Sequence, residues 1–235
     1  IKQGDVFAIT ATGDEEDMDN IRFFAEDGTL KAERNPIEKP WRLCLFCSDN
    51  REMVVNVTMP VLNDLSVNGG TRASIEGFTQ DEMTMTIRNG SRVETSAAID
   101  TVTADVNGGS RLTSTTAAQS IDLRIANASR VEWLANAANV KAEINGGSRL
   151  VLEGNGDVMN MTAYNGSTIE AQDFLANDVT ILVSGGSRGD VHAKTSLNAR
   201  ALNGSRVEYA NTGITPIIDA SSGSRVDETG SEMYE

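Results

Sequence analysis

Two cysteines and one histidine are the residues of this chain whose types most often carry redox, metal or acid–base chemistry. Cys44 and Cys47 form a C-x-x-C pair, and His192 is far from them in sequence. A redox C-x-x-C pair normally begins a helix, whose N-terminus lowers the thiol pKa, whereas WRLCLFC has the pattern of a strand. A four-ligand zinc site would need further cysteines or histidines. We therefore interpret both cysteines as structural, whether or not a disulfide links them, and His192 as a solvent-facing or loop residue.

Arginines and acids alternate on one register of a repeated segment. An arginine follows a hydroxyl residue in eight of nine copies, and an acid stands two residues later in six. Stacked at the strand spacing of roughly 4.8 Å, the arginines would repel one another without these acids. We interpret the ladder as solvated charge balancing, with a dedicated anion or glycan site as the alternative. The candidate ladder residues are Arg92, Glu94, Arg130, Glu132, Glu170, Arg206 and Glu208.

These charges are positioned by a corner motif that recurs every 18 to 20 residues. Self-similarity at this period is typical of a solenoid. The residue before the hydroxyl is glycine in eight copies and Ala128 in the ninth, which indicates positive φ or a close approach at a sharp corner. The nine hydroxyl residues are Thr71, Ser91, Ser110, Ser129, Ser148, Ser167, Ser187, Ser205 and Ser224. The structural corners that we select are Gly90, Ser91, Gly109, Ser110, Gly147, Ser148, Gly166, Ser167, Gly204 and Ser205.

Apolar and polar residues alternate on both sides of each corner. The positions six and four residues before the hydroxyl are apolar in every copy, as in Leu123 and Ile125, and the position two residues after it is apolar or glycine. Period two is the pattern of a strand with one buried face, and a helix does not produce it. The pattern predicts an all-β stack with a narrow interior, in which the hydroxyls point inward and the arginines outward.

The size of one physical coil has two interpretations. Two residues before the hydroxyl, glycine and asparagine alternate strictly through eight copies, and the asparagine copies are 38 residues apart. A coil of 19 residues would place unlike residues above one another. A coil of 38 residues with two corners would stack like on like and form an asparagine ladder. We favour the 38-residue coil as a hypothesis, which contact of Ser129 with both Ser110 and Ser148 would contradict.

Composition excludes several classes of partner. The net charge of −14 disfavours nucleic acid and anionic membrane surfaces. No apolar run has the length of a membrane span. The chain begins at Ile1 in the middle of a strand pattern, so we expect a processed or truncated start.

Three segments are expected along the chain. Residues 1–62 form N-terminal β strands and a cap continuous with the stack, and they include a hairpin of Ile21–Ala25 with Thr29–Glu33. Residues 63–228 form a β-solenoid of nine corner repeats. Residues 229–235 form an acidic tail that we interpret as solvated, with a calcium-binding cluster as the alternative. The exposed ends of a strand stack often pair with another chain, which makes a homo-oligomer one option.

The order of these pieces resembles a known family. The opening QGDVFAITATGD (Gln3–Asp14), the later DGTLKAE (Asp27–Glu33) and TMPVLNDLSVNGG (Thr58–Gly70) before the repeat are similar to the GIN domain, the head domain of putative autotransporter adhesins. The resemblance covers essentially the whole chain. It implies a single-stranded right-handed parallel β-helix, export to the periplasm, outer membrane or cell surface, and an adhesin role, without catalytic residues to transfer. This chain departs from the family's usual corner by placing arginine after the hydroxyl.

Two functions from different classes are consistent with these observations. The first is a non-enzymatic extracytoplasmic module that presents flat β-helix faces to a protein or glycan, with no cofactor or metal. The alternative is a polysaccharide lyase or hydrolase of the pectinase type, for which the fold is the only argument. Such enzymes need clustered carboxylates in a cleft formed by long loops. Here the loops are short, and Trp133, Tyr164 and Tyr209 are the only aromatic residues on the repeats that could stack on sugars.

Overall fold

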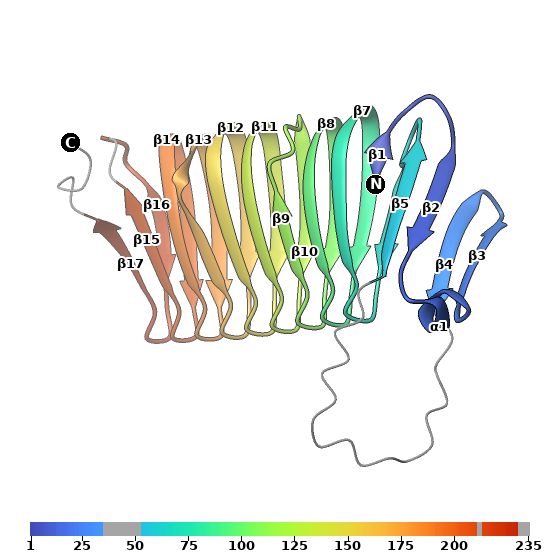
Figure 1. Ribbon diagram of the computed structural model, residues 1–235. Coiled ribbons are helices and arrows are strands. Elements are labelled where there is room, and N and C mark those ends of the chain that lie inside the picture. The colour runs from blue at the N-terminus through green and yellow to red at the C-terminus, as the bar shows by residue number, and fades with distance from the viewer. Residues whose placement is uncertain (35–52, 211–212, 230–235) are drawn as a thin grey trace, which may run out of the picture. The chain divides into compact units, whose positions relative to one another are not determined.

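The computed structural model describes residues 1–34, 53–210 and 213–229, and Figure 1 shows their arrangement. Contacts divide the chain into two compact units, residues 2–60 and residue 1 with residues 61–235. The interpretation of Cys44 and Cys47 lies outside the described residues, as does most of the acidic tail. Among the described residues, no helix has the length and apolar character needed to cross a membrane.

The unit of residues 2–60 is built of short strands. They are β1 (Lys2–Gln3), β2 (Ala8–Thr12), β3 (Ile21–Glu26), β4 (Thr29–Arg34) and β5 (Val54–Met59), with the single-turn helix α1 (Glu15–Met18) between β2 and β3. Strand β5 pairs with β1 in parallel and with β2 in antiparallel orientation. Strands β3 and β4 form the predicted hairpin, and Asp27 and Gly28 make its turn with φ of 50° and 75°.

The unit from residue 61 onward is a parallel β-solenoid, as predicted. Its coils lie in one row in Figure 1, with their tight corners aligned along one edge. Its strands are β6 (Asp64–Val67), β7 (Arg72–Ile87), β8 (Arg92–Val106), β9 (Arg111–Ser114), β10 (Ser120–Ile125), β11 (Arg130–Ile144), β12 (Arg149–Ala163), β13 (Thr168–Ser184), β14 (Arg188–Leu202), β15 (Arg206–Ala210), β16 (Ile217–Ala220) and β17 (Arg225–Thr229).

Each coil has a post-corner arm and a pre-corner arm, which a bend separates. In β11, for example, the post-corner arm pairs with β9 and β12, and the pre-corner arm pairs with β10 and β12. From the coil of Ser91 to the coil of Ser205, the three predicted apolar positions are buried in every copy. The inward alternation therefore forms a continuous core that neighbouring coils share, which is how a solenoid is stabilised.

The 38-residue coil is wrong, and one coil contains about 19 residues. Arg130 pairs in register with Arg111 on one side and with Arg149 on the other, so successive corners are direct neighbours. The backbone N–H of Ser129 donates to Oγ of Ser148 at 3.2 Å, and that of Ser110 donates to Oγ of Ser129 at 3.2 Å. The contact that contradicts the 38-residue hypothesis is therefore present.

Glycine and asparagine alternate because the asparagine of one coil packs closely against the glycine at the same position of the next coil. The side chain of Asn127 reaches back to the preceding coil, where its Nδ2 donates to Oδ1 of Asn107 at 2.8 Å. In the following coil, a Cβ on Gly146 would lie 3.2 Å from the backbone nitrogen of Asn127 and 3.4 Å from its Oδ1. An asparagine side chain thus occupies the space that a side chain in the next coil would need. The same pairing recurs at Asn89 with Asn68 and at Asn165 with Asn145.

Replacing Ala128 by glycine should stabilise the protein by about 0.5–1 kcal/mol. Ala128 has φ of 59°, in the left-handed region that costs an L-residue roughly 1–2 kcal/mol. The greater freedom of glycine in the unfolded chain offsets about 0.4–1 kcal/mol of that gain. Urea unfolding measures the difference. The matched control is Gly147→Ala, at the same position one coil later with φ of 70°, which should destabilise. A loss of stability in Ala128→Gly would contradict the corner geometry.

Candidate functional site

The corner serines form an internal ladder. Seven of them, from Ser91 to Ser205, are at most 2% exposed. Backbone N–H groups donate to the hydroxyl of the next coil, as Ser187 does to Ser205 at 3.1 Å, and several hydroxyls donate to the carbonyl three residues earlier, as Ser148 does to Asn145 at 2.7 Å. In most coils the hydroxyl thus satisfies a buried amide at the corner, whereas the hydroxyls of Ser91 and Ser167 have no partner among the described residues. The position of the corner serines in the interior gives them a structural role.

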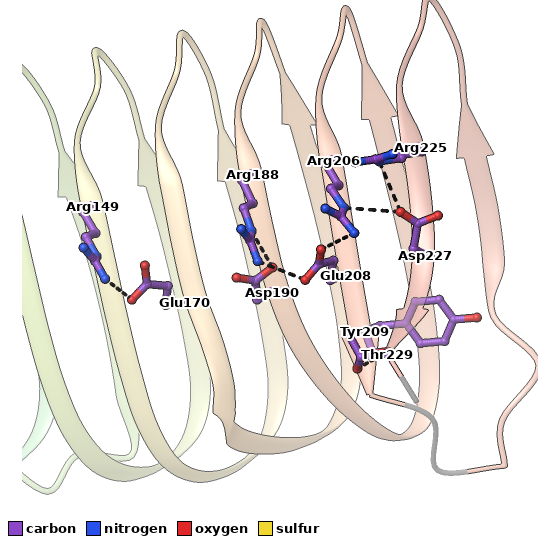
Figure 2. A network of polar contacts seen from close by, with 10 residues as sticks. All are labelled: Arg149, Glu170, Arg188, Asp190, Arg206, Glu208, Tyr209, Arg225, Asp227 and Thr229. Atoms are coloured by element: carbon purple, nitrogen blue, oxygen red, sulfur yellow. Dashed lines mark hydrogen bonds and ion pairs between the residues drawn. The ribbon is translucent and has the colours of Figure 1, made fainter. Parts of the chain in front are cut away.

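The arginine and acid positions form a ladder on the outer face of the post-corner arms, which Figure 2 shows at its C-terminal end. Arg188 lies 3.0 Å from Asp190 through Nε and 2.9 Å from Glu208 through Nη2. Arg206 contacts both Glu208 and Asp227, and Arg225 contacts Asp227. Closer to the N-terminus, Arg130 pairs with Glu132, and Arg149 pairs with Glu170 of the next coil. These ion pairs link adjacent coils as well as residues of one coil.

The carboxyl of Asp190, in this ladder, has a pKa above its ordinary value. Its residue is 8% exposed, and burial raises the pKa of its carboxyl although the hydrogen bond and charge of Arg188 oppose the change. The nearby carboxylates Glu208 and Glu170 raise the Asp190 pKa further. The same hydrogen bond raises the pKa of Arg188. At the end of the stack, burial and the charge of Glu228 raise the pKa of Tyr209.

The N-terminal part of the ladder differs. Arg72, Arg92 and Arg111 are stacked in register in adjacent coils and are exposed. Among the residues that the structure describes, none of the three forms an ion pair, and Glu94 stays unpaired although it lies on the same face. Of the candidate ladder residues, the structure therefore joins Arg130 with Glu132 and Arg206 with Glu208, whereas Arg92 and Glu94 remain apart. A binding role for this ladder remains a prediction.

A groove at the bends between the two arms was not predicted from the sequence. It has a volume of about 780 Å³ and takes lining residues from seven adjacent coils, from Thr79 to Lys194. At roughly 4.8 Å per coil, these coils extend over about 29 Å along the stack. Alanine and glycine at the bends leave the space open. The recurrence of small residues seven to nine positions after the corner hydroxyl is the sequence signal that could have indicated it. These small residues are Ala98, Ala117, Ala118, Ala137, Ala138 and Gly156.

Polar side chains line the groove in columns. In one column, Nδ2 of Asn155 donates to Oδ1 of Asn136 at 3.2 Å. In a neighbouring column, Nδ2 of Asn177 donates to Oδ1 of Asp157 at 2.9 Å. The charged lining residues are Asp81, Asp100, Asp157 and Lys194. The groove therefore offers rows of amide and carboxylate groups with excess negative charge, suited to a ligand rich in hydroxyl donors.

The aromatic and histidine candidates do not line this groove. Trp133 is 2% exposed, and its Nε1 donates to the carbonyl of Thr116 at 3.1 Å, so it is a core residue and not a sugar-stacking platform. Tyr209 is 6% exposed and Tyr164 is half-buried. His192 lies within strand β14 and not in a loop. Its Nδ1 is 3.3 Å from the carbonyl oxygen of Gln172. Within the described ranges, no three His, Cys, Asp or Glu residues gather as metal ligands would.

Solved structures share this fold. A putative adhesin from Parabacteroides merdae matches with a TM-score of 0.62 at 13% identity, over 97% of this chain and 86% of that one. A putative lipid binding protein from Parabacteroides distasonis matches with a TM-score of 0.59 at 16% identity, over 97% of this chain and 87% of that one. At these identities the likeness is one of fold alone. No curated protein matches the chain.

A family model matches nearly the whole chain in two overlapping segments. It is described as "Putative auto-transporter adhesin, head GIN domain", and it matches residues 1–115 and 105–213. The two matches overlap within the repeat, as a periodic stack allows, and together they include the N-terminal pieces and most of the solenoid. The resemblance seen in the sequence is thereby confirmed. The chain belongs to the family of head GIN domains of putative auto-transporter adhesins.

Proposed function

We propose that this chain is a non-enzymatic binding module that acts outside the cytoplasm and holds a partner along its solenoid. The observation that carries the proposal is the groove at the bends, which crosses seven coils and takes much of its lining from alanine and glycine. Its partner is an extended, hydroxyl-rich chain, such as a neutral glycan. The amides of Asn136, Asn155 and Asn177 lie in coils at strand spacing and offer both donors and acceptors to units of such a chain.

The family supports this assignment. Its description as the head of an adhesin agrees with a rigid rod that presents a long surface at the cell exterior. The likeness to a protein described as lipid binding makes lipid a second ligand to test. The groove favours the glycan, because carboxylates and amides line it and burying them against an acyl chain would leave them unsatisfied.

Blocking the groove should abolish glycan binding. Ala117 is exposed on the groove, so Ala117→Trp adds a bulky side chain there without entering the core. We expect the wild-type chain to bind at least one neutral linear polysaccharide on a glycan array. Ala117→Trp should weaken that binding at least tenfold. The matched control is Ser96→Trp, at an exposed position outside the groove, which should bind as the wild type does.

The same samples test the alternatives. Release of reducing sugar or unsaturated uronate above the blank would contradict the non-enzymatic assignment and favour the lyase or hydrolase. Binding to neutral phosphatidylcholine vesicles without binding to any glycan would favour lipid as the ligand. Equal binding of Ala117→Trp and wild type would place the site away from the groove.

A further inference from the structure

The charge ladder of the post-corner face changes character along the stack. From Arg130 to Arg225, five arginines face five carboxylates, and each of these arginines forms at least one ion pair. In the three coils before Arg130, the arginine positions are all filled, but the acid positions contain Ser74, Glu94 and Thr113. At these positions three arginines face one acid, and Glu76 is a further exposed carboxylate on this face of β7, four residues after Arg72.

Within the described part of the chain, this imbalance leaves a column of guanidinium groups that form no ion pair. Arg72 pairs in register with Arg92, and Arg92 with Arg111, so the three Cα atoms lie at the spacing of adjacent coils, roughly 4.8 Å. All three residues are exposed. Like charges at this distance repel one another, and each guanidinium has five N–H donors in a planar fork that matches carboxylate or sulfate oxygens. A bound anion would remove the repulsion and accept these hydrogen bonds.

We propose that Arg72, Arg92 and Arg111 form a binding strip for a linear polyanion, such as a glycan with repeating carboxylate or sulfate groups. A chain with charges in a row places one anionic group at each arginine, so its affinity grows with the number of groups engaged. This site is separate from the groove, whose Asp81, Asp100 and Asp157 would repel the same polymer. The net charge of −14 also disfavours non-specific attraction of a polyanion to the protein. Binding of such a polymer would therefore indicate a local site, which is the arginine strip.

Binding of oligogalacturonates of increasing length tests the strip. We expect galacturonate monomer to bind weakly and chains of three or more units to bind at least tenfold more tightly. Affinity should fall steeply between 50 and 200 mM NaCl, roughly as expected for release of counterions. Dextran sulfate, beside neutral dextran, distinguishes sulfate from carboxylate as the preferred group.

Two triple variants with the same change of net charge make the test specific. Arg72→Gln, Arg92→Gln and Arg111→Gln together should weaken binding at least tenfold. Arg88→Gln, Arg124→Gln and Arg200→Gln remove the same charge from the pre-corner side and should change affinity less than threefold. Glu94→Gln removes the one carboxylate at the three acid positions of the strip and should strengthen binding. Circular dichroism checks that each variant retains its β structure.

Several outcomes would overturn the proposal. One is an equal loss in both triple variants, which would indicate net charge alone. Another is the absence of binding to either polyanion at 50 mM NaCl. A third is loss of polyanion binding in Ala117→Trp, which would place the polymer in the groove. If the groove assignment is wrong, the binding of neutral glycans will be absent or unchanged in Ala117→Trp, while the binding of polyanions can still depend on the three arginines. The two proposals can therefore fail independently.

Discussion

Gly154→Ala is expected to destabilise the protein by about 3–5 kcal/mol, because backbone strain and overpacking act together. Gly154 has φ of 126°, and a Cβ at this position would lie 1.9 Å from the carbonyl oxygen of Ala135 and 2.7 Å from its carbonyl carbon. Both atoms belong to the backbone of the preceding coil, so no change of rotamer can relieve the clash. The register between β11 and β12 must shift instead.

Urea unfolding followed by circular dichroism measures this effect, and hydrogen exchange locates it. Exchange should accelerate first in the amides of β11 and β12, because each coil contacts only its neighbours. The control is Glu153→Ala, one residue earlier and exposed, which should change stability by less than about 0.5 kcal/mol. A Gly154→Ala protein within 1 kcal/mol of the wild type would show that the coils approach less closely than described.

Trp133→Ala is expected to destabilise by about 3–5 kcal/mol, as large-to-small core substitutions of this kind do. Trp133 is the largest fully buried side chain among the described residues. It also supports an irregular coil, since its Nε1 donates to the carbonyl of Thr116 in the segment between β9 and β10. Thr116 is linked in turn to Thr95, with 3.2 Å between their Oγ1 atoms. Loss of the indole therefore removes packing and leaves a buried carbonyl without this donor.

Trp133→Phe separates these two contributions. Phenylalanine retains most of the apolar volume but cannot donate to Thr116, so the expected loss is about 1–3 kcal/mol, the cost of an unsatisfied buried group. Leu134→Ala is the matched control, since Leu134 is the next residue and is 53% exposed. Thermal and urea unfolding should show the largest loss of stability in Trp133→Ala, a smaller loss in Trp133→Phe and the smallest in Leu134→Ala. Equal stability of Trp133→Ala and Leu134→Ala would refute a core role for the indole.

What the sequence could predict is the conformation of single coils. Apolar residues at fixed offsets from the corner hydroxyl indicate inward-facing strand positions, because alternation of side chains is a property of one strand. Two consecutive positive φ values at the corners agree with the recurrent glycine and asparagine, since these residues adopt that conformation at little cost. The fold class, the buried serines and the outward arginines therefore follow from local patterns.

The interpretation of the Gly/Asn alternation was wrong for a reason that lies between coils. We expected like residues to stack, as amide ladders do in fibrils. In the structure, Asn127 is hydrogen-bonded to Asn107 of the previous coil, which lies one position before the residue in register with Asn127. In the next coil, the residue in register with Asn127 is Gly146, whose missing side chain avoids a close contact with Asn127. The period of 38 residues is thus a property of contacts between coils of about 19 residues.

The sequence by itself determined which side of each strand faces the core, because that depends on neighbours one and two residues away. Only the tertiary structure decided which charges meet and where the surface is hollow. Arg149 pairs with Glu170 and not with an acid of its own coil, and Ala98 lies beside Ala117 on the groove. These contacts join residues about 19 positions apart, so they depend on the register between coils. Hydrogen bonding across the whole stack sets that register.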